Sequence, residues 1–212
     1  IEWSSNFAYA IGLLTTDGNL SKDGYHLNLT SKDEELISNF KRCLNLSNKI
    51  GRKGRDGSTE KKYFVVQFGD KNFYEFLLGI GLKQAKSKIL EELNIPKECF
   101  WDFLRGCIDG DGSIGFYGHP ESKHPQLRVR LFSASPKFLN WVKDTIAKNS
   151  NLKGGWIENA MKESRVYKLV FAKEDSIKLL NLIYNNPHYY LSRKYEVVKK
   201  FYGRVAELGI RA

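Results

Sequence analysis

The amino-acid sequence predicts an α+β protein built from two similar halves. The first observation is a repeated pattern: an apolar segment that ends in Asp-Gly, at residues 10–18 and again at residues 104–112. The second is that alternating polar and apolar residues follow each segment, which is typical of strands with one exposed face. We therefore expect the order α-β-β-α-β-β-α to occur twice, each half having a saddle-like antiparallel sheet.

Small residues lie at matching places in the two apolar segments. Superposing the segments aligns Gly12 with Gly106 and Thr16 with Gly110, which leaves small residues four apart on one face of each predicted helix. Such faces allow two helices to pack closely, and the packing would bring Asp17 and Asp111 together. Two neighbouring carboxylates repel each other and favour hard divalent cations, which take oxygen ligands. This pattern predicts a metal site suited to phosphoryl chemistry.

The remaining elements also repeat. A break at Asn94-Ile95-Pro96 divides the chain into proposed halves of residues 1–96 and 97–212. A final helix is expected in each half, beginning near Lys86 or Lys194. We expect strands at residues 26–30, 49–53, 62–68, 126–132, 155–159 and 165–172. Besides the two apolar segments and the final helices, we expect helices at residues 32–44, 73–78, 136–149 and 176–183.

Composition narrows the class of partner. The formal net charge is +10, with 34 Lys and Arg against 24 Asp and Glu, so a polyanion such as nucleic acid is favoured. The three cysteines and four histidines lack the spacing of a zinc site or a disulfide framework. No apolar run reaches the roughly 20 residues that span a bilayer. We expect a soluble, intracellular protein with no membrane partner.

The two Asp-Gly segments resemble the signature of the LAGLIDADG homing endonucleases, and the second, LRGCIDGDG, is the closer match. The resemblance covers almost the whole chain. It implies that the two signature helices form the interface between pseudo-symmetric halves. It also implies that Asp17 and Asp111, with the adjoining Gly18 and Gly112, form the site of the catalytic metal. The first copy departs from the pattern at Thr15, where the second copy has Asp109.

A second stretch, GLKQAKSK at residues 81–88, resembles the family's Gly-Leu-x-x-x-Lys-Ser stretch, whose lysine lies beside the scissile phosphate. By the internal repeat, residues 191–195 are its counterpart. Lys86 and Lys194 are thus candidate catalytic residues, because a cation there would offset charge on the phosphate or hold the water network. The alternative is that each is an ordinary solvated lysine near a helix start.

Polar side chains on the predicted strands are candidates for DNA contacts. Base edges in the major groove are read by Arg, Lys, Asn or Gln projecting from a ribbon. For any single residue, the alternative is a solvated surface side chain. The candidates for base contacts are Asn28, Arg52, Gln67, Gln126, Arg128 and Arg130, and the candidates for phosphate contacts are Lys53, Arg55, Lys61, Lys62 and Arg165.

The resemblance implies a monomer that hydrolyses both strands of a long, specific duplex site and leaves short 3′ overhangs. Mg²⁺ is the expected cofactor, with Mn²⁺ able to substitute and Ca²⁺ expected to bind without supporting cleavage. The target would be pseudo-palindromic or asymmetric. The rival interpretation is an intron maturase, or another DNA-binding protein, that has the same fold and does not cleave DNA.

Overall fold

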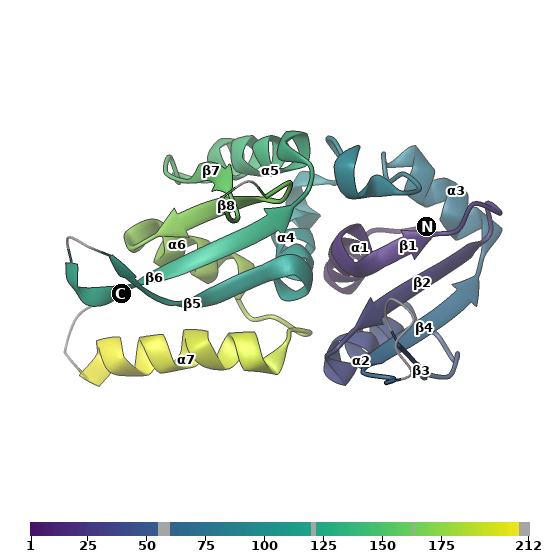
Figure 1. Ribbon diagram of the computed structural model, residues 1–212, viewed down its shortest axis with the longest axis horizontal. Coiled ribbons are helices and arrows are strands. Elements are labelled where there is room, and N and C mark those ends of the chain that lie inside the picture. Colours follow the sequence, from purple (N-terminus) through teal and green to yellow (C-terminus); the bar gives the residue numbers. More distant parts are fainter. Residues whose placement is uncertain (55–59, 120–121, 163, 208–212) are drawn as a thin grey trace.

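The computed structural model describes residues 1–212 except 55–59, 120–121, 163 and 208–212. Its described part contains two four-stranded antiparallel sheets, one in each half of the chain. Helices α1 and α4 lie between the two sheets at the centre of the molecule (Figure 1). The α+β architecture with two similar halves is therefore as predicted.

The elements of the first half are α1 (Ser5–Asp17), β1 (Gly18–Leu20), β2 (His26–Ser31), α2 (Glu34–Cys43), β3 (Gly51–Lys53), β4 (Tyr63–Gly69), α3 (Lys71–Gly79) and the 3₁₀ turn η1 (Lys86–Lys88). The second half begins with the 3₁₀ turn η2 (Lys97–Cys99). It continues with α4 (Phe100–Asp111), β5 (Gly112–His119), β6 (Ser122–Ser133), α5 (Pro136–Asn149), β7 (Trp156–Asn159), β8 (Tyr167–Ala172), α6 (Glu174–Ile183) and α7 (Ser192–Glu207).

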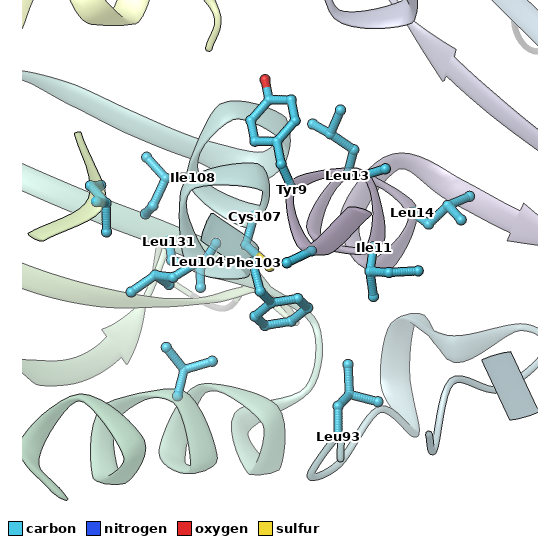
Figure 2. Packing of buried hydrophobic residues seen from close by; sticks show 14 of the residues in the cluster. Tyr9, Ile11, Leu13, Leu14, Leu93, Phe103, Leu104, Cys107, Ile108 and Leu131 are labelled. Carbon is cyan, nitrogen blue, oxygen red and sulfur yellow. The ribbon is translucent and has the colours of Figure 1, made fainter. Parts of the chain in front are cut away.

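The two halves meet where α1 and α4 pack backbone against backbone. A Cβ atom on Gly12 would lie 2.1 Å from the carbonyl oxygen of Phe103, and one on Gly106 would lie 2.2 Å from that of Tyr9. Cys107 and Phe103 lie beside α1 in this interface (Figure 2). Only glycine allows so close an approach, so the small residues predicted to face each other are required by the packing.

Each sheet buries one face and leaves the other open. The strand orders are β1-β2-β4-β3 and β5-β6-β8-β7, so the two sheets have the same topology. Leu27 and Leu29 of β2 face the core, as do Leu127 and Val129 of β6. The alternate residues of these strands are only partly buried, as expected for sheets with one covered face. The open faces are available for a partner.

The predicted helix near Lys86 does not form. Residues 86–88 form a single 3₁₀ turn, which follows the left-handed residue Ala85, with φ 48°. Leu90 and Leu93 are buried within the next few residues, and the chain must then reach the start of α4. The counterpart near Lys194 does form a long helix, α7. The strands β1 and β5 also begin directly at Gly18 and Gly112, with no intervening turn.

Among the described helices, none has the length and apolar character needed to cross a membrane.

Replacement of Gly106 by alanine tests the helix contact. Alanine normally stabilises a helix interior relative to glycine, but here its methyl group would meet the backbone of α1. We therefore expect Gly106→Ala to lower the free energy of unfolding by roughly 1–3 kcal/mol, measured by denaturant unfolding. Gly79→Ala is the matched control, because a Cβ atom added there would have no atom within 4 Å. A Gly106→Ala variant as stable as the Gly79→Ala variant would contradict the close contact.

Candidate metal centre and nucleic-acid interface

Asp17 and Asp111 are the last residues of α1 and α4. Both line one groove of about 590 Å³, in which Asp17 is half-buried and Asp111 more exposed. A Cβ atom on Gly110 would lie 2.7 Å from Oδ2 of Asp17, so glycine leaves room for this carboxylate. The groove runs from the carboxylates onto the open face of the first sheet. The other residues lining it are Thr16, Asn19, Asn28, Thr30, Ser31, Lys32, Asp33, Lys53 and Tyr63.

The two carboxylates carry unfavourable charge. Partial burial, reinforced by repulsion from Asp111, raises the pKa of Asp17 to about 7. Burial also raises the pKa of Asp111, although Lys194 and Lys86 oppose the increase. A bound cation would remove this cost by compensating both negative charges. The electrostatics of the groove therefore fit a divalent metal ion.

The ligand set fits a hard divalent cation such as Mg²⁺. Among the described residues, no cluster of three or more His, Cys, Asp or Glu side chains forms a metal site made of protein alone. Mg²⁺ is usually held by one or two carboxylates together with water and substrate phosphates. Asp17 and Asp111 match this arrangement, because they open onto a groove that would admit a phosphate.

Lys86 and Lys194 are buried, with 7% and 4% of their surface exposed. The alternative interpretation, that they are solvated lysines, is therefore wrong. The Lys86 ammonium donates to the carbonyl oxygen of Gly18, and the Lys194 ammonium donates to that of Gly112 at 2.7 Å. Burial lowers the pKa of each lysine to about 8, while nearby carboxylates act in the opposite direction. The two lysines thus occupy matching positions beside the carboxylates.

Gly18 and Gly112, which we predicted to belong to the metal site, adjoin the two carboxylates. Their carbonyl oxygens accept hydrogen bonds from the lysine ammonium groups, and their part in binding a metal stays a prediction. A lysine ammonium beside each of these oxygens repels a second cation there. The carboxylates of Asp17 and Asp111 are consequently the groups best placed to bind metal.

A smaller cavity of about 60 Å³ lies between Lys86 and Asp111, with Phe132 and Phe138 among its walls. Its volume is sufficient for ordered water, and its walls include both charged and hydroxyl groups. Lys86 belongs to the first half of the chain and Asp111 to the second. The cavity is therefore assembled from both halves.

The open face of the first sheet holds most of the predicted base-contacting residues of that half. Asn28 and Gln67 are paired across β2 and β4, and Lys53 reaches the groove from β3. Arg52 is not on this face. It pairs with Phe64, which packs against the core, and its guanidinium lies 4.2 Å from the centre of that ring.

The open face of the second sheet presents two arginines. Arg128 and Arg130 alternate with the buried residues of β6, and the guanidinium of Arg130 lies 3.5 Å from the ring centre of Tyr117. The Nε atoms of both arginines lack a hydrogen-bond partner among the described residues. Gln126 lies further along the same strand, opposite Tyr117. Both Nε atoms are buried, so contact with a partner would have to come from the other atoms of these side chains.

The remaining predicted phosphate contacts lie in loops. Lys61, Lys62 and Arg165 are exposed, and Lys62 forms an ion pair of 2.7 Å with Glu60. Arg55 lies outside the described residues. Loop lysines and arginines of this kind suit contacts with phosphates, which carry affinity without sequence choice.

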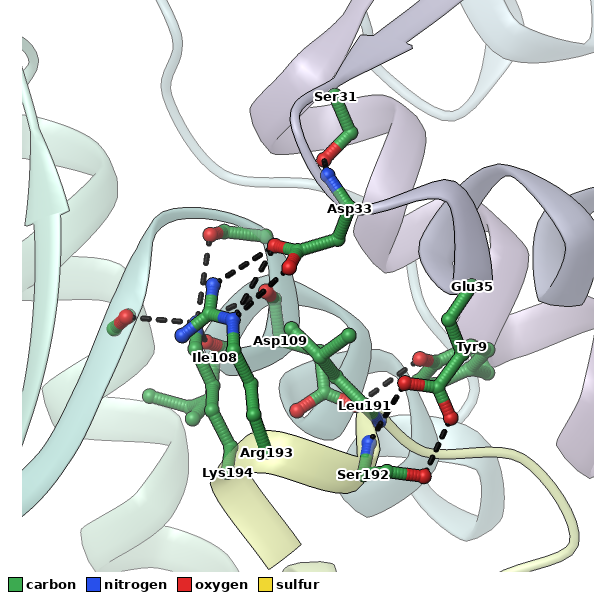
Figure 3. Close-up of polar contacts among 12 residues, drawn as sticks. Tyr9, Ser31, Asp33, Glu35, Ile108, Asp109, Leu191, Ser192, Arg193 and Lys194 are labelled. Atoms are coloured by element: carbon green, nitrogen blue, oxygen red, sulfur yellow. Dashed lines mark hydrogen bonds and ion pairs between the residues drawn. The ribbon is translucent and has the colours of Figure 1, made fainter. Parts of the chain in front are cut away.

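Sequence reasoning missed a connection between the halves near Lys194. The guanidinium of Arg193 binds both carboxylate oxygens of Asp33, with the closest contact at 2.8 Å. The backbone nitrogen of Ser192 donates to Glu35 at 3.0 Å (Figure 3). The start of α7 is thereby joined to the start of α2. No motif marks these four residues, because their side chains meet only in the folded structure.

Similar solved structures come from the LAGLIDADG group. The homing endonuclease I-DmoI in complex with DNA and Mn has a TM-score of 0.55 and 19% identity, over 88% of this chain and 98% of that one. The LAGLIDADG homing endonuclease I-GzeII in complex with its DNA target has a TM-score of 0.59 and 13% identity, over 97% and 91%. The N-terminal LAGLIDADG domain of WhiA has a TM-score of 0.56 and 14% identity, over 85% and 82%.

These similarities establish the fold. The chain has the single-chain, two-domain fold of LAGLIDADG homing endonucleases, which is the fold predicted from the two signature segments. No protein-family model and no curated protein sequence matches the chain. At this level of identity, its activity must be argued from its own residues.

The charge cost at Asp17 predicts a pH-dependent effect on stability. The folded carboxyl has a pKa of about 7, whereas an unfolded aspartate ionises near pH 4. Folding stability attributable to this group is therefore lost as the pH rises from about 4 to about 7. Asp17→Asn should be more stable than the parent at about pH 7.5, by on the order of 1–2 kcal/mol after allowance for solvent screening. The difference should shrink toward pH 4, as measured by denaturant unfolding.

Asp23→Asn is a control of opposite sign. Hydrogen bonds from the backbone and side chain of His26, and from the backbone of Tyr25, lower the pKa of Asp23 to about 2. Its replacement should give no stabilisation at about pH 7.5. If Asp17→Asn is no more stable than Asp23→Asn at that pH, the ionised Asp17 does not carry the cost of burial and repulsion described here.

Proposed function

We propose that this protein is a site-specific endonuclease of double-stranded DNA that requires a divalent cation. The observation that carries the proposal is the pair of carboxylates, Asp17 and Asp111, at the ends of the two packed helices. They open onto a groove and have buried lysines on either side. The net charge of +10 and the two open sheet faces also support a DNA partner.

The cation would be Mg²⁺, held by Asp17 and Asp111, with Mn²⁺ able to replace it and Ca²⁺ binding without cleavage. When bound, it supplies charge compensation for the displacement at phosphorus. Similar proteins were solved with Mn or Mg, namely I-DmoI with DNA and Mn and an I-DmoI variant with DNA and Mg. Lys86 and Lys194 would stabilise developing negative charge and hold water near the scissile phosphates.

The placement of the carboxylates supports cleavage of both strands. The minor groove of B-DNA is only about 6 Å wide, so neighbouring acids across it would face phosphates on opposite strands and produce short 3′ overhangs. One open sheet would lie in the major groove on each side. We propose that the protein acts as a monomer, with halves of residues 1–96 and 97–212, on a long site of limited symmetry.

A second candidate function is DNA binding without cleavage, as in a regulator or an intron maturase. The similarity to the WhiA domain is the reason to test this candidate, because that protein is described by its LAGLIDADG domain and the fold alone does not fix an activity. The two functions differ in what they require of Asp17 and Asp111. Cleavage needs both charges, whereas binding alone does not.

A library of candidate duplex sites in a plasmid would separate the two functions. Incubation with Mg²⁺ should linearise plasmids that carry the target, and incubation with Ca²⁺ should retain them by binding alone. Sequencing of the ends would show whether 3′ overhangs are produced. A protein that retains specific plasmids in Ca²⁺ and never cuts them in Mg²⁺ or Mn²⁺ would be a binding protein.

Replacement of either carboxylate tests the catalytic assignment. Asp17→Asn and Asp111→Asn should each abolish double-strand cleavage, because the amide keeps the shape and loses the charge that holds the cation. Specific binding and folding should be retained, and weak nicking by one variant is compatible with the proposal. Plasmid cleavage and gel-shift titration measure the two properties. A double variant that remains fully active in Mg²⁺ would exclude this site.

A comparison of strand and loop residues separates specificity from affinity. Arg128→Ala or Arg130→Ala should cost on the order of 1–3 kcal/mol in binding and relax the choice of one or two base pairs. Lys61→Ala or Lys62→Ala should weaken all sites alike and reduce the log–log salt slope by about one per phosphate contact. Titrations on single-base variants of the target at several salt concentrations measure both effects. Uniform loss in all four variants would mean that β6 does not read bases.

A further inference from the structure

Asp109 is a fully buried carboxylate outside the groove. It accepts hydrogen bonds from the hydroxyl of Tyr9 at 2.9 Å, the hydroxyl of Tyr184 at 2.9 Å and the backbone nitrogen of Leu191 at 2.8 Å. Burial of a carboxylate is costly unless its oxygens are satisfied, and three donors satisfy them here. The Asp109 carboxylate is therefore part of an internal hydrogen-bond network and has no contact with solvent.

Two attachments join Asp109 to the start of α7. Its side chain binds the backbone nitrogen of Leu191, the residue that precedes the helix, and its backbone oxygen accepts from the Lys194 ammonium at 2.8 Å. The backbone nitrogen of Lys194 in turn donates to the carbonyl oxygen of Leu191 at 3.0 Å. Fixing Leu191 thus fixes the turn that carries Lys194 (Figure 3).

The other half holds its lysine differently. The residue matching Asp109 is Thr15, whose hydroxyl donates to Ile11 within the same helix at 2.8 Å. In the described part of the chain, the Lys86 ammonium donates to one carbonyl oxygen, whereas the Lys194 ammonium has four carbonyl oxygens within hydrogen-bond distance of its three N–H donors. The two lysines therefore differ in their support, although they occupy matching places.

We propose that Asp109 is a positioning residue that holds Lys194, and not Lys86, in place beside the carboxylates. Loss of its charge would loosen the Leu191 contact and free the first turn of α7. Resting on the proposed endonuclease function, this predicts that the two DNA strands depend on Asp109 unequally. One strand would be cut with Lys194 held by Asp109, and the other with Lys86 held independently.

The first experiment needs no DNA. Lysines of the intact chain are acetylated with a limiting amine-reactive reagent, and labelling is quantified by peptide mass spectrometry. Asp109→Asn should increase labelling of Lys194 several-fold and leave Lys86 at the parent rate. Thr15→Val is the matched control at the equivalent position and should change neither lysine. Equal increases at both lysines would indicate general loosening and overturn the proposal, as would no increase at Lys194.

Tyr184→Phe keeps the carboxylate and removes one donor to Asp109, so it covers the case in which Asp109→Asn does not fold. It should increase labelling of Lys194 more than that of Lys86. An unchanged Lys194 in a folded Tyr184→Phe variant would count against the proposal.

The second experiment resolves the strands. On an end-labelled target duplex with Mg²⁺, Asp109→Asn should slow cleavage of one strand on the order of tenfold to a hundredfold, so that nicked DNA accumulates. Lys194→Met should impair the same strand, and Lys86→Met the other. Equal slowing of both strands by Asp109→Asn would overturn the unequal dependence. If the parent protein cuts neither strand, the endonuclease function fails, while the labelling result still decides whether Asp109 positions Lys194.

Discussion

The contact between the backbones of α1 and α4 is the constraint on which the rest of the structure depends. Gly12 and Gly106 allow the two helices to touch without intervening side chains, so the helix ends converge. This convergence places Asp17 and Asp111 in one groove. The buried Lys86 and Lys194 then donate to the carbonyl oxygens of Gly18 and Gly112, the glycines that follow the two aspartates. Larger residues at the crossing would separate the halves and the charged groups together. The placement of the two carboxylates is therefore a consequence of helix packing.

Two aspartates and two lysines at the helix ends partly compensate one another's charges. Burial disfavours the ionised forms of the two aspartates and of the two lysines, while their opposite charges partly compensate. The lysines also satisfy carbonyl oxygens at the ends of α1 and α4, which a helix leaves without partners. The same ammonium groups thus stabilise the helix ends and set the positive potential of the site. Holding these paired charges in a partly buried site has a cost in stability.

The fold could be predicted from sequence because its signals are local and repeated. Asp-Gly after an apolar helix marks both helix ends, and the alternation in residues 126–132 marks the strand β6 correctly. Arg52 was assigned to the wrong face because β3 has three residues, and a shift of one residue reverses every side chain. The burial of Lys86 and Lys194, and the contacts of Asp33 with Arg193, depend on residues far apart in sequence. No periodicity or motif records such contacts.

The stacking of Arg130 on Tyr117 has a thermodynamic consequence. A free arginine side chain loses much rotational freedom when it binds, which opposes association. Here the ring of Tyr117 holds the guanidinium, 3.5 Å from its centre, before any partner arrives. Much of that loss of freedom has already occurred during folding. Binding through Arg130 would therefore carry a smaller entropic penalty than binding through an unsupported arginine on the same face.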